Sequence, residues 1–426
     1  MMGVVLVIID GLGDEYIESL GGTPLDYASS RMRALNTMAA EGVCGIMHPI
    51  SPGVPPSSDI GHLAIFGYDI RREYPGRGYF EAMGAGIRLK DGVAFRVNLA
   101  TVERRGRNLI VIDRRAGRIS GSDAEELYRA LDAAIKERGL QAEIVHTFEH
   151  RGVLILRGEE LCGAVYDTDP HEVGVPVLAA EPWDEISSGL REIAARVAAM
   201  INEITRLSYD VLEHHDINAR RRREGLPPAN IILVRGGGVA RRIASFREKW
   251  GMRAAFVAAG PLYKGIARAL GMDEMHVEGA TGTPNTNLPG KVEACIRALD
   301  MGYDFVYLHI KGTDNLSHDK KPLEKAKFLM RIDEALSPLL DLEDVLIVVT
   351  GDHATSSIRG RHIGLPVPIV FWGTTHRDNV TRFSERECSR GCLGVLRGKD
   401  VMPLIMDLTD RSAELGTRPS KNLLLL

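Results

Sequence analysis

The chain has 426 residues, more than one ordinary hydrophobic core holds, so we expect two domains. Hydrophobic residues make up 44% of it and charged residues 26%, a balance typical of soluble globular proteins. The formal net charge is −4, and without a basic field we expect no nucleic-acid partner.

Neither end of the sequence resembles a targeting or anchoring segment. The apolar N-terminal run is short, lacks a basic leader and ends in Asp10, as a buried strand does. No stretch of about 18 or more apolar residues occurs, so we expect no membrane partner. The terminal leucine run, 423–426, is too short to anchor the chain.

The five cysteines are odd in number and mostly dispersed, which favours a reducing, cytoplasmic compartment. Cys388 and Cys392 are four residues apart and could form a disulfide or bind a soft metal. Metal binding is disfavoured there because no second cysteine pair accompanies them. Whether the two thiols pair stays open at this point.

The first and last thirds of the chain alternate between strand-like and helix-like patterns. Residues 3–9 form a continuous apolar run, typical of a strand buried on both faces, and helical periodicity occurs at 291–299 and 323–336. Three more apolar runs occur late, at 304–310, 345–349 and 366–371. This alternation predicts an α/β fold, a doubly wound and mostly parallel sheet with helices on both faces.

The middle of the chain predicts a different, smaller α+β domain. We expect antiparallel strands at 93–102, 108–113 and 152–157, with a helix at 123–138. A long amphipathic helix at 183–208 is followed by a basic, turn-rich connector at 218–228 and one more strand at 230–234. The parallel sheet resumes at 254–259. The predicted domains are therefore 1–72 with 255–426, and an insertion at 73–254.

Polar residues follow several of the predicted parallel strands. Asp10 comes directly after the first strand, Asp314 follows the strand ending near Ile310, and Asp352 and His353 follow the strand 345–349. Sites in parallel sheets form beyond the carboxyl ends of the strands. We therefore expect these side chains to meet at one edge of the sheet.

Ser58 begins a helix-like stretch after a segment rich in Pro and Gly, so its hydroxyl would lie near free backbone N–H groups. An ordinary helix-capping serine explains the same pattern. Asp314 and His318 are four apart, so one helical turn would place both on one metal, although a helix-start Asp and a surface His would look alike. His362, in a GRHIG segment, is on its own the weakest candidate.

Taken together, these residues favour phosphoryl transfer. A serine nucleophile and a phosphate dianion both need their negative charge neutralised, which two divalent metals achieve. Mixed carboxylate and imidazole ligands suit manganese, zinc or cobalt better than magnesium or calcium alone.

The motifs also resemble a known family. The matching stretches include IIDGLGD (8–14), SDIGHLAIFGYD (58–69), DRRAGRI (113–119), HRGVLILRG (150–158), GPLYKGIARALGM (260–272), HIKGTDNLSHD (309–319) and GDHAT (351–355). They cover essentially the whole chain and resemble, in order, the archaeal-type 2,3-bisphosphoglycerate-independent phosphoglycerate mutases of the alkaline phosphatase superfamily.

The resemblance implies an alkaline-phosphatase-like fold and an isomerase of glycolysis and gluconeogenesis that interconverts 3- and 2-phosphoglycerate. It implies two metals, manganese foremost with cobalt, zinc or magnesium as alternatives, and no 2,3-bisphosphoglycerate. Ser58 would become phosphoserine and also contact metal. One metal would be held by Asp10, Asp352 and His353, and the other by Asp314, His318 and His362.

The resemblance further implies that the insertion binds phosphoglycerate. The candidate contacts are Asp113, Arg114, His150, Arg151 and Arg235, with Lys264 contacting the phosphoryl group. The expected partner is this small molecule, and the protein would be a monomer or a homo-oligomer.

Several alternatives stay open at this point. The nucleophile could be Ser57, although the Ser-Asp-x-x-His register favours Ser58. His62 in that register could support the ligands or simply pack beneath the loop, and simple packing is favoured. The function could be that of a metal-dependent phosphatase or related esterase, or of a mutase acting on another phosphate ester. An inactive relative is disfavoured because the full set of candidate residues is present.

Overall fold

The computed structural model describes residues 2–416, and the terminal run 423–426 lies outside them. The chain divides into two compact units. Unit 1 comprises Met1–Tyr74, Phe246–Ala259 and Gly271–Leu426, and unit 2 comprises Pro75–Ser245 and Gly260–Leu270. The predicted insertion was 73–254, whereas in the structure 246–254 belongs to unit 1 and 260–270 belongs to unit 2.

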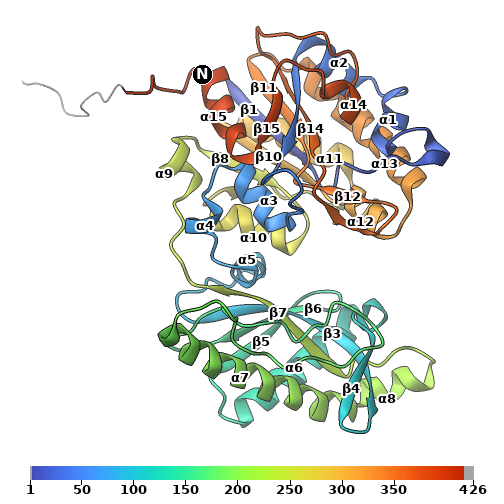
Figure 1. Cartoon of the computed structure of the whole chain (residues 1–426), viewed down its shortest axis with the longest axis vertical. Coiled ribbons are helices and arrows are strands. Elements are labelled where there is room, and N and C mark those ends of the chain that lie inside the picture. Colours follow the sequence, from blue (N-terminus) through green and yellow to red (C-terminus); the bar gives the residue numbers. More distant parts are fainter. Residues whose placement is uncertain (1, 417–426) are drawn as a thin grey trace, which may run out of the picture. The chain divides into compact units, whose positions relative to one another are not determined.

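Unit 1 is built on an eight-stranded sheet (Figure 1). The strand order is β15-β2-β14-β11-β1-β10-β8-β9. The strands are β1 (Gly3–Ile9), β2 (Val43–His48), β8 (Ala254–Val257), β9 (Asp273–Glu274), β10 (Phe305–Ile310), β11 (Val345–Thr350), β14 (Val367–Trp372) and β15 (Gly394–Arg397). The pairings are parallel except those of β14 with β11 and with β2. A mostly parallel sheet was predicted and is confirmed.

Helices cover both faces of this sheet. They are α1 (Pro24–Ser29), α2 (Ala34–Glu41), α3 (Ser58–Ile65), α4 (Ile70–Glu73), α9 (Phe246–Trp250), α11 (Leu288–Asp300), α12 (Gly312–His318), α13 (Pro322–Leu336), α14 (Glu385–Cys388) and α15 (Gly398–Leu408). Val5 and Val7 of β1 pack in one core with α1, α2, α11 and α13. On the other face, the Tyr307 ring contacts Phe66, which follows α3.

A two-stranded hairpin completes unit 1. β12 (Ala354–Ser356) follows Asp352 and His353 directly and pairs antiparallel with β13 (Arg361–Ile363). His362 lies opposite Thr355 in this hairpin, so it belongs to a strand and not to a loop. Cys388 is buried and Cys392 is exposed, and both are free thiols, so they do not form the disulfide that the sequence left open.

Unit 2 holds a five-stranded antiparallel sheet of β3 (Val93–Arg105), β4 (Asn108–Asp113), β5 (Ala142–Phe148), β6 (Arg151–Leu156) and β7 (Ile231–Val239). Helices α6 (Gly121–Glu137) and α7 (Ser188–Glu213) pack on one face (Figure 1). Helix α5 (Arg77–Gly84) packs against the other face, beside α10 (Pro261–Ala269). The α+β class predicted for the middle of the chain is confirmed.

One predicted element of unit 2 is wrong. The stretch 218–228 was predicted to be a turn-rich connector, but most of it belongs to α8 (Asp216–Arg223). His215 caps this helix, accepting a hydrogen bond from the Ile217 N–H, and Arg221 is buried and bonded to Pro227 and Ala116 carbonyls. These tertiary contacts stabilise a helix whose four consecutive arginines carry no apolar periodicity.

Among the described residues, no helix has both the length and the apolar composition needed to span a membrane.

Candidate active site at the sheet edge

Three neighbouring strands of unit 1 carry candidate residues at their carboxyl ends. β11, β1 and β10 lie side by side and run parallel, so their ends open onto one edge of the sheet. Asp10 follows β1, Asp352 and His353 follow β11, and Asp314 lies in the first turn of α12 after β10. All four side chains are buried. The convergence expected from the sequence is therefore what the structure contains.

Ser58 is brought to this edge by α3. Its Oγ lies 3.2 Å from His353 Nε2. Gly61 allows the approach, because a Cβ there would be 2.4 Å from the Asp352 carbonyl oxygen. Ser57, the alternative nucleophile, is the extended residue that precedes the helix and makes no capping hydrogen bond with its side chain. The geometry therefore favours Ser58, the first helical residue.

Asp10, Asp352 and His353 form the first group that could hold a metal. His353 Nε2 is 3.5 Å from Asp10 Oδ1 and 3.3 Å from Asp352 Oδ2. Asp352 Oδ1 accepts a hydrogen bond from the Gly11 N–H, whereas its buried Oδ2 accepts none from the described residues. The Oδ2 atom has imidazole nitrogens of His353 and His62 within 3.4 Å but no hydrogen bond from the described residues, so its buried negative charge is only partly compensated, which fits a cation.

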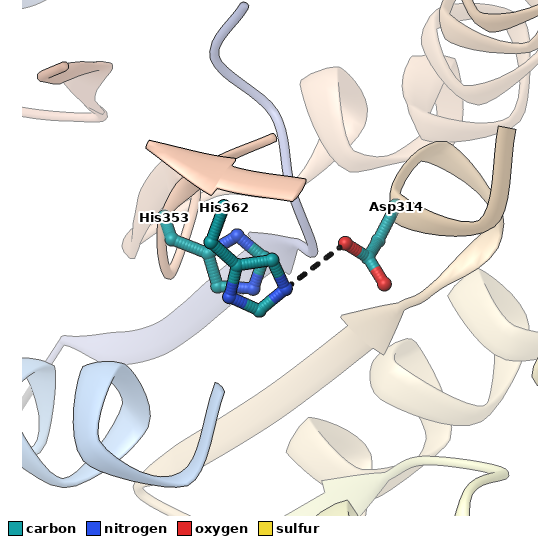
Figure 2. Close-up of side chains that lie close together, drawn as sticks. All are labelled: Asp314, His353 and His362. Carbon is teal, nitrogen blue, oxygen red and sulfur yellow. Dashed lines mark ion pairs between the residues drawn. The ribbon is translucent and has the colours of Figure 1, made fainter. Parts of the chain in front are cut away.

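Asp314, His353 and His362 form the second group (Figure 2). His362 Nε2 lies 3.5 Å from Asp314 Oδ1, and the His353 and His362 rings stack with centroids 3.6 Å apart. His318, one helical turn beyond Asp314, places its Nε2 3.3 Å from the same oxygen and so joins the second group. The structure therefore brings together all seven residues predicted for this site, with His353 close to both groups.

Hydrogen-bond contacts at Nδ1 fix the ring orientations of the three candidate ligand histidines. His318 Nδ1 lies 2.7 Å from the Gly360 carbonyl, and His362 Nδ1 lies 2.8 Å from the Pro56 carbonyl. His353 Nδ1 is 3.0 Å from Thr355 Oγ1, whose hydroxyl donates to Asp314 Oδ1. With the Nδ1 atoms bonded in this way, each imidazole presents Nε2, which is how metal-binding histidines are commonly held.

The charges at the edge also suit cation binding. Burial raises the pKa of Asp10, but nearby Lys311 and the His309 hydrogen bond outweigh it, so the pKa lies below its usual range. Burial likewise raises the pKa of Asp314, and Lys311 and His318 more than offset it. Burial lowers the pKa of His353 to about 4, so its imidazole is neutral at pH 7, as a ligand must be.

Two further histidines contact the candidate ligand carboxylates. His62 is fully buried, with its Nδ1 2.7 Å from the Ser58 carbonyl and 3.4 Å from Asp352 Oδ2. His309 Nε2 lies 3.0 Å from Asp10 Oδ2. Simple packing beneath the nucleophile loop was favoured for His62, but it also contacts the candidate ligand Asp352, which is the alternative that the sequence left open.

The candidate residues of unit 2 have different environments. Asp113 accepts hydrogen bonds from the Arg115 and Gly117 N–H groups and so shapes a turn. Arg114 makes a two-pronged ion pair with Asp169, at 2.8 and 2.7 Å. Lys264 lies on α10.

His150, Arg151 and Arg235 belong to a largely buried cluster of basic residues on the α5 face of the sheet, and Arg96 is a member that the sequence reasoning missed. Arg96 lies directly opposite Arg235 in the pairing of β3 with β7. The Nε atoms of the three arginines and Nδ1 of His150 are buried without hydrogen-bond partners among the described residues. Like charges opposite each other in a sheet are destabilising, so this cluster fits an anion.

The electrostatics of the cluster agree with a surplus of positive charge. Burial, then the neighbouring Arg77, lowers the pKa of Arg235 to about 10. Burial, then Arg151, lowers the pKa of His150 to about 2. Burial raises the pKa of Glu81, but Arg96 and Arg77 more than offset this and leave it below its usual range. Two carboxylates, Glu81 near Arg96 and Asp169 near Arg235, face more guanidinium groups than they can neutralise, which leaves positive charge for an anionic ligand.

Fold and site together define the class of this protein, an α/β enzyme whose reactive groups gather beyond the carboxyl ends of parallel strands. A model of the 2,3-bisphosphoglycerate-independent phosphoglycerate mutase family matches residues 39–218. The curated mutases of that name from Methanocaldococcus jannaschii and Pyrococcus horikoshii are 44% and 45% identical over 417 and 419 residues, covering 97% of this chain and 98% of each relative. The chain therefore belongs to the 2,3-bisphosphoglycerate-independent phosphoglycerate mutase family, and it is an isomerase.

Two solved structures are also similar. One, of a protein from Pyrococcus horikoshii, is 36% identical with a TM-score of 0.81 and covers 98% of this chain and 99% of its own. The other, a cofactor-independent phosphoglycerate mutase from Thermoplasma acidophilum, is 35% identical with a TM-score of 0.64 and covers 96% and 100%. The resemblance stated from the motifs is confirmed, and so is the α/β fold class.

Proposed function

We propose that the chain interconverts 3-phosphoglycerate and 2-phosphoglycerate through a phosphoserine on Ser58, without 2,3-bisphosphoglycerate. The observation that carries the proposal is the position of Ser58 Oγ, 3.2 Å from His353 Nε2, beside two groups of carboxylates and imidazoles. A serine at the first position of a helix lies at the positive end of the helix dipole, which favours a bound phosphoryl group.

In this proposal Asp10, Asp352 and His353, with Ser58, would hold one divalent metal, and Asp314, His318 and His362 the other. When bound, such metals would neutralise the phosphate and stabilise the attacking and leaving oxygens. The carboxylate and imidazole donor set supports manganese first, with cobalt, zinc or magnesium as alternatives. Asp352 Oδ2, buried without a hydrogen bond from the described residues, supports a cation at the first group.

The reaction itself is a pair of transfers. Ser58 Oγ would lose its proton and form a bond to the phosphorus as the bond to the glycerate 3-oxygen breaks, and the departing 3-oxygen would take up a proton. The glycerate would then reorient, and its 2-hydroxyl would take the phosphoryl group back from Ser58. Water must be excluded while the phosphoserine exists, because hydrolysis would turn a mutase into a phosphatase.

Unit 2 would act as the substrate-binding domain. The guanidinium groups of Arg96, Arg151 and Arg235 offer buried, unsatisfied N–H donors of the kind that read phosphate and carboxylate groups. We propose His150 and Lys264 as further contacts. Arg114 and Asp113 stay candidates, and Arg114 would have to share its guanidinium between Asp169 and the substrate.

The partner is a charged small molecule, and we infer a cytoplasmic enzyme of glycolysis and gluconeogenesis, either monomeric or homo-oligomeric. The test is phosphorus NMR of the purified protein with 3-phosphoglycerate and manganese. Accumulation of the 2-isomer, abolished by chelation and restored by manganese, supports the proposal. Release of inorganic phosphate at the rate of substrate loss would instead identify a phosphatase, and an inert 3-phosphoglycerate would point to another phosphate ester.

A further inference from the structure

Lys311 lies between the two groups of candidate metal ligands. It directly follows β10 and precedes α12. Its Nζ is 3.3 Å from Asp10 Oδ1 and 2.7 Å from Asp314 Oδ2. Asp10 belongs to the first group and Asp314 to the second, so one ammonium pairs with a carboxylate of each.

The two contacts of Lys311 are not equivalent. At Asp10, Oδ2 is occupied by His309, which leaves Oδ1 as the oxygen that faces His353. Lys311 contacts this same Oδ1. A cation bound by the first group would therefore compete with Lys311 for the oxygen.

At Asp314 the arrangement is the reverse. His318, His362 and the Thr355 hydroxyl all approach Oδ1. Lys311 uses the other oxygen, Oδ2, at 2.7 Å. A cation at the second group can thus share Asp314 with Lys311, each on its own oxygen.

Both carboxylates are nearly inaccessible to water, with side chains 0% and 3% exposed. Two buried carboxylates without metal would repel each other and lose their hydration, so a positive charge is needed to hold them in place. Lys311, whose side chain is 19% exposed, reaches them from the more open side.

We propose that Lys311 is a resident counter-cation of the empty site, which the metal at the Asp10 group displaces from Asp10 Oδ1 while the bond to Asp314 Oδ2 persists. Lys311 is then a positioning residue that holds the two carboxylates in place and weakens metal binding at the Asp10 group but not at the Asp314 group. The inference rests on the two-metal assignment in the proposed function.

The test is a manganese titration of metal-free protein, followed by calorimetry or electron paramagnetic resonance. It is made in a His318→Ala background, which lacks a ligand of the second group, so that the isotherm reports the Asp10 group. Lys311→Met is compared with Lys327→Met, a matched control because Lys327 is exposed, forms an ion pair with Glu324 on its own helix and carries the same charge. Lys311→Arg keeps the charge.

We expect Lys311→Met to bind manganese at least about tenfold more tightly than the control, because a competing charge within 4 Å has been removed. Lys311→Arg should stay within about threefold of the parent protein. Unchanged or weaker binding by Lys311→Met would overturn the proposal, because a lysine that merely supports the site would lower affinity when lost.

A second readout covers the case in which Lys311→Met is unstable. The thermal midpoint of the metal-free protein should fall, and the rise on adding manganese should exceed that of the control. A variant that folds only with manganese supports the proposal, and one that is equally unstable with and without manganese contradicts it. The titration requires no turnover, so tight metal binding by an inactive protein would refute the proposed reaction alone, whereas absence of metal binding would refute both.

Discussion

Ser58 Oγ and His353 Nε2 lie 3.2 Å apart, although 295 positions separate the two residues in sequence. The first begins a helix after β2, and the second follows β11. The contact joins a candidate nucleophile to an imidazole that stands within reach of both ligand groups. A serine merely capping a helix would need no such partner, so this contact separates the catalytic interpretation from the capping one.

Replacing the nucleophile should abolish turnover and spare metal binding. Ser58→Ala is expected to lower kcat for 3-phosphoglycerate by about 10³-fold or more, because no other hydroxyl would accept the phosphoryl group. Ser57→Ala, one residue earlier, should retain most activity because its side chain makes no capping bond. The reverse ranking of the two variants in a steady-state assay would move the nucleophile to Ser57.

Loss of one histidine should remove one metal and leave the other. In His362→Ala, the second group loses a ligand, whereas the first group, which contains Asp10 and Asp352, is unchanged. Bound manganese measured by elemental analysis should therefore fall from two ions per chain toward one. Activity should fall with it and recover partly at high manganese concentration. A variant that still bound two ions with unchanged affinity would show that His362 is not a ligand.

Arg96 should matter for activity without being needed for stability. Arg96→Met removes a donor for an anionic substrate, and we expect kcat/KM to fall by about 100-fold, in keeping with loss of one partner of a buried charged pair. The thermal midpoint should change little, because the variant relieves repulsion between Arg96 and Arg235 while Glu81 keeps its ion pair with Arg77. Arg105→Met, exposed on the same strand, is the control. Equal losses of stability and activity would indicate a structural role.

Glu385 should make unit 1 less stable as the pH rises. Burial raises the pKa of this carboxyl from 4.5 to about 7, although the Thr23 hydroxyl donates to it. The folded state therefore binds the proton more tightly than the unfolded state. The associated stability is fully present below about pH 4.5 and is lost as the pH rises through about 7, by on the order of 3 kcal/mol.

The measurement is urea unfolding at pH 5 and pH 8 for the wild type and Glu385→Gln. The amide cannot ionise, so the wild type should lose more stability between the two values than the variant does. Ionisable groups other than Glu385 are common to both proteins and cancel in the difference. Identical pH profiles would show that Glu385 titrates normally in the folded chain.

The parallel-strand part of the site was predictable because its signals are local. Asp10, Asp314 and Asp352 each follow an apolar run, and the rule that sites form at carboxyl ends brings them to one edge. The Asp314 and His318 pair follows in the same way from helical spacing, with 3.3 Å between them in the structure.

His362 could not be placed by local rules. It reaches the site because β13 pairs with β12, which sets His362 opposite Thr355. That pairing depends on a hairpin of three-residue strands, too short to show alternation in sequence. In sequence His362 was the weakest candidate on its own, and only the family resemblance gave it a metal-binding role.

The cationic cluster of unit 2 was found only in part for a different reason. Arg96 occurs within the strand-like run 93–102, where its neighbours are apolar. A single arginine in such a run is typical of an ordinary surface position. In the structure the α5 face of the sheet is buried at this point, so Arg96 is only 8% exposed. Which face of a strand is covered depends on packing between distant segments, and period-two alternation alone does not reveal it.

The central claim is that Ser58 carries the phosphoryl group during turnover, and peptide mass spectrometry after rapid acid quenching tests it most directly. The wild type is mixed with manganese and 3-phosphoglycerate and quenched at intervals spanning one turnover. The account predicts one phosphoryl group on Ser58, absent after chelation and absent from Ser58→Ala. Full-rate isomerisation with no phosphorylated Ser58 at any interval, or with the group on Ser57, would contradict it.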